Sequence, residues 1–389
     1  MALLPPIRLT GARVLRDGAF CDDALTLAEG MIADGPAPSV DLTGYWVMPG
    51  IVDLHGDGFE RHLTPRPSAP FDKTRALRSV AAELAANGVT TAWMAQSWSW
   101  EGGFRGADSC EALLVALDGA KEGLLPDLRV QIRLETHVPD EHPRLLEAVR
   151  RHGVDYVIYN NHLPEGLELA ERAPQRFAAW AAQQARTPQM LLTIIEEADR
   201  VSHRVPEALA ALSQEFAALG VVTGSHDDGD AVTRASYRAL GASVCEFPTS
   251  VAAAEAAKAA GEPVLMGAPN VVRGGSQSGN VAAEALVAAG LCDALVSDYY
   301  YPALSQAAFA LAARGVMGIE AAWELVSTGA ARVMGLSDRD DLAPGKRADL
   351  VVVNPETQAI EATICAGRLA FAQGGAAARL MGPALMAAQ

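Results

Sequence analysis

The chain has 389 residues, half of them apolar and a fifth charged, which is typical of a soluble globular protein with a large core. Its formal net charge of −16 and its pI near 4.9 argue against non-specific binding to nucleic acid or to an anionic membrane. A small anionic substrate is not excluded, because a few Arg and Lys side chains in one pocket can bind it.

The cysteines and the N-terminal segment indicate the cellular compartment. Five cysteines are scattered along the chain without a CxxC pair, which predicts reduced thiols. The first residues, MALLPPIRL, contain two prolines and an arginine where a signal peptide would need an unbroken apolar core. No apolar run approaches the ~20 residues of a membrane span. We therefore expect a cytoplasmic protein, and a homo-oligomer is left open.

Both ends of the chain are expected to form short strands. Apolar runs such as IRLTGARVL alternate with turn residues in the first 48 residues, and residues 340–373 repeat this pattern. Two β-rich ends that flank a different middle predict one small, discontinuous β-sandwich domain, made of residues 1–48 and 339–389. Residues 49–338 are left for a second domain.

The middle of the chain alternates apolar runs with Ala-rich amphipathic stretches, as repeated βα units of a parallel sheet do. The candidate strands are 50–57, 89–96, 129–135, 156–161, 221–226, 243–248, 263–268 and 294–298. That is the number which a closed barrel requires. A longer helical insertion is expected at 165–219. The predicted fold is α/β, a (β/α)8 TIM-type barrel with the small sandwich beside it.

Residues that can bind a metal follow several of these strands. His55 and Asp57 stand two positions apart at the end of the first strand, so both side chains would project to one side. Further candidates end later strands: Glu135, His162, His226 and Asp298. Each alone could be structural, but the carboxyl ends of barrel strands share one face. We expect one or two divalent ions there, Zn²⁺ first and Mn²⁺ or iron as alternatives.

Asp298 is also the candidate for proton transfer. It follows the last strand in LVSDYYYP. Beside a water whose pKa a metal has lowered, an aspartate can accept the proton and pass it to a leaving group. The structural alternative is an aspartate that caps the next helix.

Several sequence blocks resemble a known family. The order of MPGIVDLHGD, SDYYYP and LAPGKRADLVVV is similar to that in the amidohydrolase superfamily of metal-dependent hydrolases. One branch cleaves α-D-ribose 1-methylphosphonate 5-triphosphate to the 5-phosphate and pyrophosphate in phosphonate catabolism. The blocks that resemble this branch are HGDGFERHLTPRP at 55–67, SHDDGD at 225–230, EFPTSVAAA at 246–254, GAPNVVRGGSQSGN at 267–280 and SDYYYPALSQAAF at 297–309.

The resemblance implies roles for individual residues. His55 and Asp57 match the first-strand metal pair, and Glu135 matches a bridging carboxylate in place of the superfamily's carbamylated lysine. His226 and Asp298 match the later ligand and the acid/base. His162 follows the fourth predicted strand, whereas the superfamily's first lone histidine follows the fifth, so its ligand role stays open.

Two arginines and a glutamine are the candidates for binding the substrate's phosphates. Arg66 lies between two prolines, and Arg273 precedes a Gly-Gly-Ser sequence whose N–H groups could assist. Both could equally be ordinary loop residues. Gln277 stands where the family has a histidine, so it offers a hydrogen bond but no charge and no proton shuttle. Phe59 replaces a polar family residue and is expected at the pocket floor.

The sequence thus predicts a metal-dependent diphosphatase. The alternatives are a C–N hydrolase or deaminase of the same superfamily, and a non-catalytic barrel that binds a ligand. The non-catalytic barrel is disfavoured, because a decayed enzyme would be expected to lose some of the residues His55, Asp57, His226 and Asp298, and all four are present.

Overall fold

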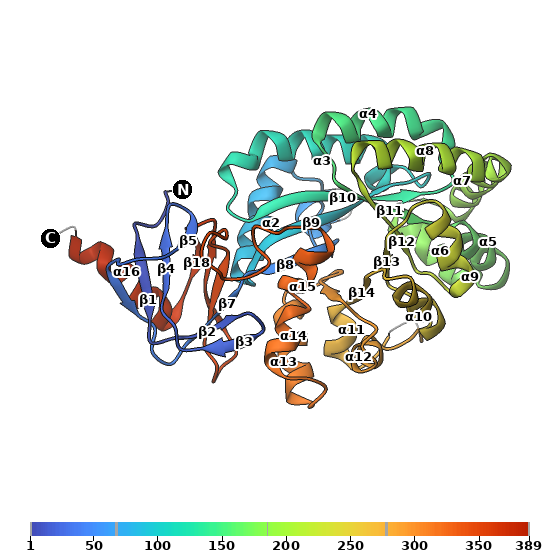
Figure 1. Ribbon diagram of the computed structural model, residues 1–389. Coiled ribbons are helices and arrows are strands. Elements are labelled where there is room, and N and C mark those ends of the chain that lie inside the picture. The colour runs from blue at the N-terminus through green and yellow to red at the C-terminus, as the bar shows by residue number, and fades with distance from the viewer. Residues whose placement is uncertain (1, 67–68, 185, 277–278, 388–389) are drawn as a thin grey trace.

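The protein has a large barrel part and a small strand-rich part, as its computed structural model shows (Figure 1). The structure describes residues 2–66, 69–184, 186–276 and 279–387. Helices surround the parallel strands of the barrel. The blue N-terminal and red C-terminal segments lie side by side in the small part, as predicted for a unit that both ends of the chain build.

In the described part of the chain, eight parallel strands form the barrel wall and follow one another in chain order. They are β8 (Ile51–Gly56), β9 (Val89–Trp98), β10 (Asp127–Glu135), β11 (Tyr156–Asn160), β12 (Val222–His226), β13 (Val244–Glu246), β14 (Val264–Gly267) and β15 (Ala294–Val296). Every predicted run overlaps one of these strands, and β9 and β10 extend beyond their predicted runs. The (β/α)8 prediction is therefore confirmed.

Helices connect the strands and cover the outside of the wall. Before β12 they are α1 (Glu60–Leu63), α2 (Lys73–Ala86), α3 (Ala107–Ala120), α4 (His142–His152), α5 (Leu163–Arg172), α6 (Pro174–Gln183), α7 (Pro188–Arg200) and α8 (Val205–Leu219). After β12 they are α9 (Ala231–Ala239), α10 (Val251–Ala259), α11 (Ala268–Arg273), α12 (Ala283–Ala288), α13 (Ala303–Ala313), α14 (Ile319–Glu324) and α15 (Thr328–Val333). Helices α5 to α8 form the predicted insertion.

Strand β10 illustrates how the sequence separates the two sides of the wall. Val130, Ile132 and Leu134 pack outward into the core shared with the helices. Since side chains alternate along a strand, the residues between them face the barrel interior. These inward residues are polar: Gln131, Arg133 and Glu135. The carboxyl half of β10 therefore supplies polar groups to the mouth of the barrel.

A β-bulge in β8 redirects His55. Asp53 pairs with Ala92 and Gly56 pairs with Met94, so one extra residue lies on β8 between the two pairs. Val52 and Leu54 pack inside the barrel. In a regular strand His55 would point to the opposite side from Leu54. The bulge changes the alternation and brings His55 to the barrel mouth.

The seam between the first and last strands is closed partly by a loop. The Leu295 N–H donates to Leu325 O (2.7 Å), and the Val52 N–H donates to Val326 O (3.0 Å). Both acceptors belong to the connection between α14 and α15. Backbone groups of β15 and β8 that lack a strand partner at this point are thus satisfied.

Nearer the mouth, a buried carboxylate completes the closure. Asp53 of β8 accepts hydrogen bonds from the Ser297 N–H (2.9 Å) and the Ser297 Oγ–H (2.6 Å) after β15. A parallel bridge joins Gly56 to Asp298. A Cβ at Gly56 would lie 2.7 Å from both Asp53 Oδ2 and Ser297 Oγ, so only glycine fits. The seam therefore fixes the position of Asp298 relative to His55.

Two sheets form the small part, in the orders β5-β4-β1-β6 and β18-β17-β16-β7-β2-β3. Their strands are β1 (Ile7–Thr10), β2 (Arg13–Arg16), β3 (Ala19–Cys21), β4 (Leu25–Ala28), β5 (Met31–Ala33), β6 (Ser39–Asp41), β7 (Trp46–Pro49), β16 (Leu350–Val353), β17 (Ile360–Cys365) and β18 (Arg368–Ala372). Side chains of both sheets share one apolar core, as a sandwich requires.

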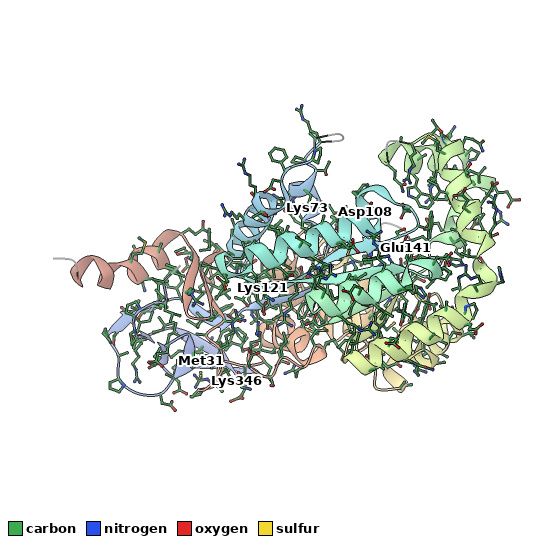
Figure 2. The ribbon with its side chains drawn as sticks, turned by 90° about the horizontal axis from the view of Figure 1, so that it is seen from above. Met31, Lys73, Asp108, Lys121, Glu141 and Lys346 are labelled. Atoms are coloured by element: carbon green, nitrogen blue, oxygen red, sulfur yellow. The ribbon has the colours of Figure 1, made fainter. Side chains whose placement is uncertain are left out.

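The two ends of the chain also contact each other directly. Figure 2 shows Met31 and Lys346 close together, and Met31 forms a bridge with Arg347. Helix α16 (Gly374–Ala387) follows the last strand, where no element is predicted from the sequence. None of the helices in the described part of the chain combines the length and the apolar composition that crossing a bilayer requires.

The seam can be tested with Ser297→Ala, which removes the hydroxyl that donates to the buried Asp53. We expect the free energy of unfolding to fall by about 1–3 kcal/mol, because a buried carboxylate oxygen loses its donor. Denaturant titration followed by tryptophan fluorescence measures this change. Ser236→Ala, at an exposed position of α9, is the control and should change stability by less than about 0.5 kcal/mol. Equal effects would contradict the role of the seam.

Candidate metal centre

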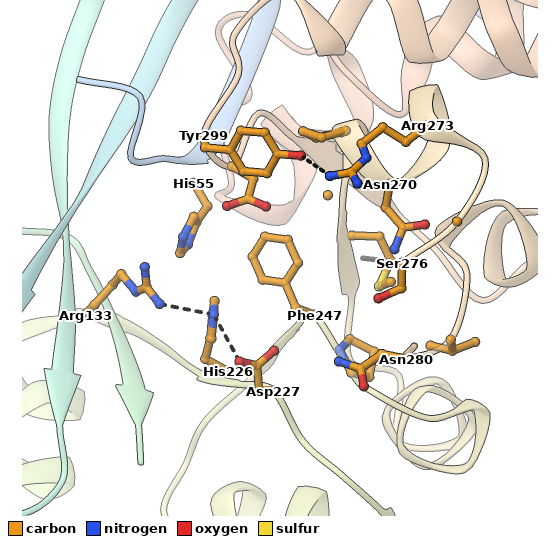
Figure 3. A pocket seen from close by; sticks show the side chains of 17 residues that line it. His55, Arg133, His226, Asp227, Phe247, Asn270, Arg273, Ser276, Asn280 and Tyr299 are labelled. Carbon is orange, nitrogen blue, oxygen red and sulfur yellow. Dashed lines mark hydrogen bonds and ion pairs between the residues drawn. The ribbon is translucent and has the colours of Figure 1, made fainter. Parts of the chain in front are cut away.

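A cavity of about 220 Å³ lies at the carboxyl ends of the barrel strands (Figure 3). Three of the predicted metal ligands line it: His55, His226 and Asp298. Two arginines, Arg133 and Arg273, also line it. In Figure 3, Arg133 and the two histidines lie on one side of Phe247, and Arg273 lies on the other. The cavity thus has an imidazole-rich wall and a second wall that begins at α11.

The carboxylate of Glu246, at the end of β13, organises the first wall. It is fully buried, and its Oε2 lies 2.8 Å from His55 Nδ1 and 3.3 Å from His226 Nδ1. Its Oε1 accepts hydrogen bonds from Gln131 Nε2 (2.6 Å) and from the Tyr156 hydroxyl (2.8 Å). Four donors from four different strands therefore surround one negative charge.

This arrangement determines which histidine nitrogens face the cavity. A carboxylate can only accept, so both histidines carry their Nδ1 proton toward Glu246. Their Nε2 atoms then keep lone pairs for another partner. His226 Nε2 lies 3.3 Å from Arg133 NH2. His55 Nε2 is buried and has no hydrogen-bond partner within the described residues.

These residues fit a divalent metal ion. Ligand atoms of His55, His226 and Glu246 all lie within 4.8 Å of one another. Glu246 already accepts four hydrogen bonds, so we assign it to orient the imidazoles rather than to bind the ion, and His55 and His226 are the two members of the group left to bind it. A histidine that donates its other N–H to a carboxylate is the usual arrangement in metal sites. The partnerless Nε2 of His55 is the atom that such an ion would satisfy.

Burial and the neighbouring charges shift the pKa values of this cluster. Burial alone would raise the pKa of Glu246, but the imidazoles of His55 and His226 lower it overall. Burial opposes a charge on His55, yet Glu246 raises the pKa of His55 overall. Burial lowers the pKa of His226, despite the opposing effect of Asp227. The carboxylate of Glu246 is therefore ionised, and His226 is the neutral imidazole.

The two predicted aspartates stand beside this wall. The Asp57 N–H donates to Asp298 O (2.8 Å), and Asp57 Oδ2 lies 3.8 Å from Arg133 NH1. Asp298 has a left-handed backbone (φ 53°), which is uncommon for a residue other than glycine. Burial, together with the charge of Asp57, raises the pKa of Asp298 to about 6. Asp298 is placed to accept a proton inside the cavity.

Glu135 and His162 form a pair of their own. His162 Nδ1 hydrogen-bonds to Glu135 Oε1, and the His162 N–H donates to Glu135 Oε2 (3.1 Å). Trp100 Nε1 also donates to Glu135 Oε2 (3.3 Å). Neither residue lines the cavity described above. These two residues therefore hydrogen-bond to each other, whereas His55, His226 and Asp298, which the sequence places at the same barrel face, line the cavity.

The second wall carries the predicted phosphate contacts only in part. Arg273 ends α11 and donates from NH1 to the Tyr299 hydroxyl (3.3 Å). Gly274 follows with φ of 78°, which turns the chain into the Gly-rich loop. Arg66 is exposed and does not line the cavity, and Gln277 lies outside the described residues. Phe59 is fully buried in the outer core, so its prediction as pocket floor is wrong.

A buried arginine stabilises the strand ends that carry His226 and Glu246. Arg234 of α9 is fully buried and lies 3.3 Å from Asp228 Oδ2 and 2.9 Å from Glu262 Oε2. It also donates to Val244 O (3.2 Å), two residues before Glu246. These contacts join the loop after β12 to β13, so the two strand ends keep a fixed spacing.

Three residues of the centre were missed in the sequence analysis: Glu246, Gln131 and Arg133. Each had a signal. Glu246 lies within the sixth predicted strand (243–248) and opens the EFPTS block. Gln131 and Arg133 precede Glu135 by four and two positions, so they share its face of the strand.

Two sequence comparisons relate the chain to known proteins. The sequence profile of the amidohydrolase family matches residues 57–371. The α-D-ribose 1-methylphosphonate 5-triphosphate diphosphatase of Escherichia coli (strain K12) is 34% identical over 328 residues, which cover 81% of this chain and 85% of the relative.

Solved structures with the same fold are far more distant in sequence. Molinate hydrolase is 13% identical with a TM-score of 0.68, and the match covers 95% of each chain. A. niger ochratoxinase is 13% identical with a TM-score of 0.62, over 96% of this chain and 97% of that one. These similarities show a shared fold.

The orienting role of Glu246 predicts the behaviour of Glu246→Gln. We expect the affinity for Zn²⁺ to fall about 10- to 100-fold, because the amide no longer fixes both imidazoles. Competition with a chromophoric chelator measures the affinity. Glu255→Gln, at an exposed position of α10, is the control. If both variants bind Zn²⁺ as the parent protein does, Glu246 does not orient the ligands.

Proposed function

The chain belongs to the amidohydrolase family, and from this premise we propose that it is a divalent-metal-dependent diphosphatase acting on a ribose-linked triphosphate. The proposed substrate is α-D-ribose 1-methylphosphonate 5-triphosphate, and the products are the 5-phosphate and pyrophosphate. One observation carries the proposal: a wall of metal donors faces an arginine and a Gly-rich loop across the same cavity. The similarity to the E. coli enzyme supports the choice of substrate.

The proposed metal ligands are the Nε2 atoms of His55 and His226 with the carboxylates of Asp57 and Asp298. Nitrogen and oxygen donors of this kind suit Zn²⁺, with Mn²⁺ or iron as alternatives. A bound ion would act as a Lewis acid on phosphoryl oxygens and lower the pKa of a water molecule. Glu135 and His162 remain the candidates for a second ion.

The proposed reaction is hydrolysis of the α–β phosphoanhydride. The oxygen of water forms a bond to phosphorus while the bond from phosphorus to the bridging oxygen breaks. Asp298 accepts the proton of the attacking water and returns it to the departing pyrophosphate. Its buried position and raised pKa suit a carboxyl group that has to accept and release a proton.

Substrate binding is assigned to the wall that begins at α11. The guanidinium of Arg273 can bind two phosphate oxygens at once. Tyr299, which accepts a hydrogen bond from Arg273, helps to hold the guanidinium in place. The N–H groups of Gly274 and Gly275 donate to Val271 O (3.1 Å) and Asn270 O (3.0 Å) at the end of α11, so the guanidinium is the group of this wall to which we assign phosphate binding.

A substrate panel tests the reaction class. The metal-loaded protein is offered α-D-ribose 1-methylphosphonate 5-triphosphate and nucleoside triphosphates beside amide and amine compounds. We expect pyrophosphate to be released from the ribose-linked triphosphates, because the arginine wall recognises their phosphates. Coupled assays for pyrophosphate and ammonia follow both outcomes. Ammonia without pyrophosphate would replace the diphosphatase with a C–N hydrolase or deaminase.

Asp298→Asn tests the proton transfer. The amide keeps the size of the side chain but cannot accept the proton, so we expect turnover to fall about 10²- to 10⁴-fold. We expect metal to stay bound, because the other proposed ligands, His55, His226 and Asp57, are unchanged. Pyrophosphate release and metal content by mass spectrometry are measured on one preparation. Asp22→Asn, at an exposed position of the small part, is the control and should keep full turnover. Full activity of Asp298→Asn would remove Asp298 from the mechanism.

A further inference from the structure

The guanidinium of Arg133 lies among the proposed metal ligands. Its NH2 is 3.3 Å from His226 Nε2, and its NH1 is 3.8 Å from Asp57 Oδ2. The side chain is largely buried, with 16% of its surface exposed. Figure 3 shows it pointing from the strand side of the cavity toward His226. Nothing assigned to the reaction so far requires a cation at this place.

Arg133 and a metal ion need the same atoms. His226 has two ring nitrogens, and Nδ1 faces Glu246. Nε2 is therefore the one ring atom of His226 whose lone pair can bind an ion. The NH2 group of Arg133 points at this same atom. The carboxylate of Asp57 likewise attracts either cation. Both cannot hold these two groups at once, so metal binding requires Arg133 to change partners.

The released guanidinium would need new acceptors. An arginine cannot lose its charge in a protein, and its five N–H donors require partners when buried. The Nε of Arg133 is already buried without a partner in the described part of the structure. Oxygen atoms of a phosphate are the acceptors that match a guanidinium in charge and geometry. The cavity that Arg133 lines is where the proposed substrate would bring them.

We propose that Arg133 exchanges partners during metal loading: it holds Asp57 and His226 in the metal-free protein, and it binds phosphate oxygens of the substrate once an ion takes these ligands. The first half stands on the geometry of the metal centre. The second half rests on the proposed function, because it assumes a phosphorylated substrate. Arg133 is then a substrate-binding residue on the metal side of the cavity, opposite Arg273.

The exchange predicts opposite effects of one substitution on two ligands. Arg133→Met removes the charge and the donors but keeps an unbranched side chain. We expect Zn²⁺ to bind at least about tenfold more tightly. The variant has no guanidinium that must first leave the ligands or that would repel the bound ion. We expect the zinc-loaded variant to bind inorganic tripolyphosphate at least about tenfold more weakly. Chelator competition and calorimetry measure these affinities without turnover.

Arg273→Met is the matched control. It removes the same groups from the opposite wall, where Arg273 bonds to Tyr299. It should weaken tripolyphosphate binding and leave the Zn²⁺ affinity unchanged. Arg133→Lys keeps the charge and loses the planar fork, so its Zn²⁺ affinity should stay near that of the parent while tripolyphosphate binds more weakly.

A second measurement keeps the test valid if Arg133→Met is less stable than the parent protein. Without Arg133, the negative charge of Asp57 loses its nearby positive charge in the metal-free protein. Saturating Zn²⁺ should therefore raise the melting temperature of Arg133→Met more than that of the parent. Zn²⁺ affinity that is equal or weaker in Arg133→Met, with no larger rise in melting temperature, overturns the exchange. If the parent protein does not bind tripolyphosphate but Zn²⁺ binding tightens, the proposed function fails and the exchange of cations stands.

Discussion

The buried charge of Glu246 is the interaction on which the candidate centre depends. An ionised carboxylate away from water is costly unless strong donors surround it. Glu246 has four such donors, and each comes from a different barrel strand. The energetic demand of one charge therefore fixes two imidazoles in one tautomer and one orientation. The proposed metal site is a consequence of satisfying Glu246.

This demand links the chemistry to the register of the barrel. Side chains alternate along a strand, so a slip of β10 by one residue would turn Gln131 and Arg133 outward into the apolar core. The bulge in β8 and the seam between Asp53 and Ser297 fix the other side of the centre. The fold is thus specified most strictly where the polar groups meet.

The sequence predicted the barrel well because its signal is local. Each of the eight runs is apolar, short and followed by a helical stretch, and these properties need no knowledge of distant residues. The centre was harder for two reasons. The prediction that His55 and Asp57 project together assumes a regular strand, whereas β8 contains a bulge that the sequence does not reveal.

The second reason is that roles at the centre follow from pairing across the barrel. Glu135 and His162 were grouped with the other ligands because all end strands, yet they bond to each other. Glu246 was passed over, although it also ends a strand. Residue type and strand position indicate which side chains reach the mouth, but hydrogen-bond partners decide whether a carboxylate binds an ion, orients an imidazole or accepts a proton.

The net charge of the chain adds a further constraint on function. A protein of charge −16 repels a polyanionic substrate at long range, although salt reduces this effect beyond about 8 Å. For the proposed triphosphate substrate, attraction would therefore arise inside the cavity, where Arg133 and Arg273 face each other across the site and charges are less screened. Asp227 and Asp298 of the same lining offset these two charges, and a bound divalent ion would add positive charge. An acidic surface around a cavity that holds two arginines favours substrates whose phosphates reach deep into the barrel mouth, and it disfavours extended polyanions that would have to lie along the surface.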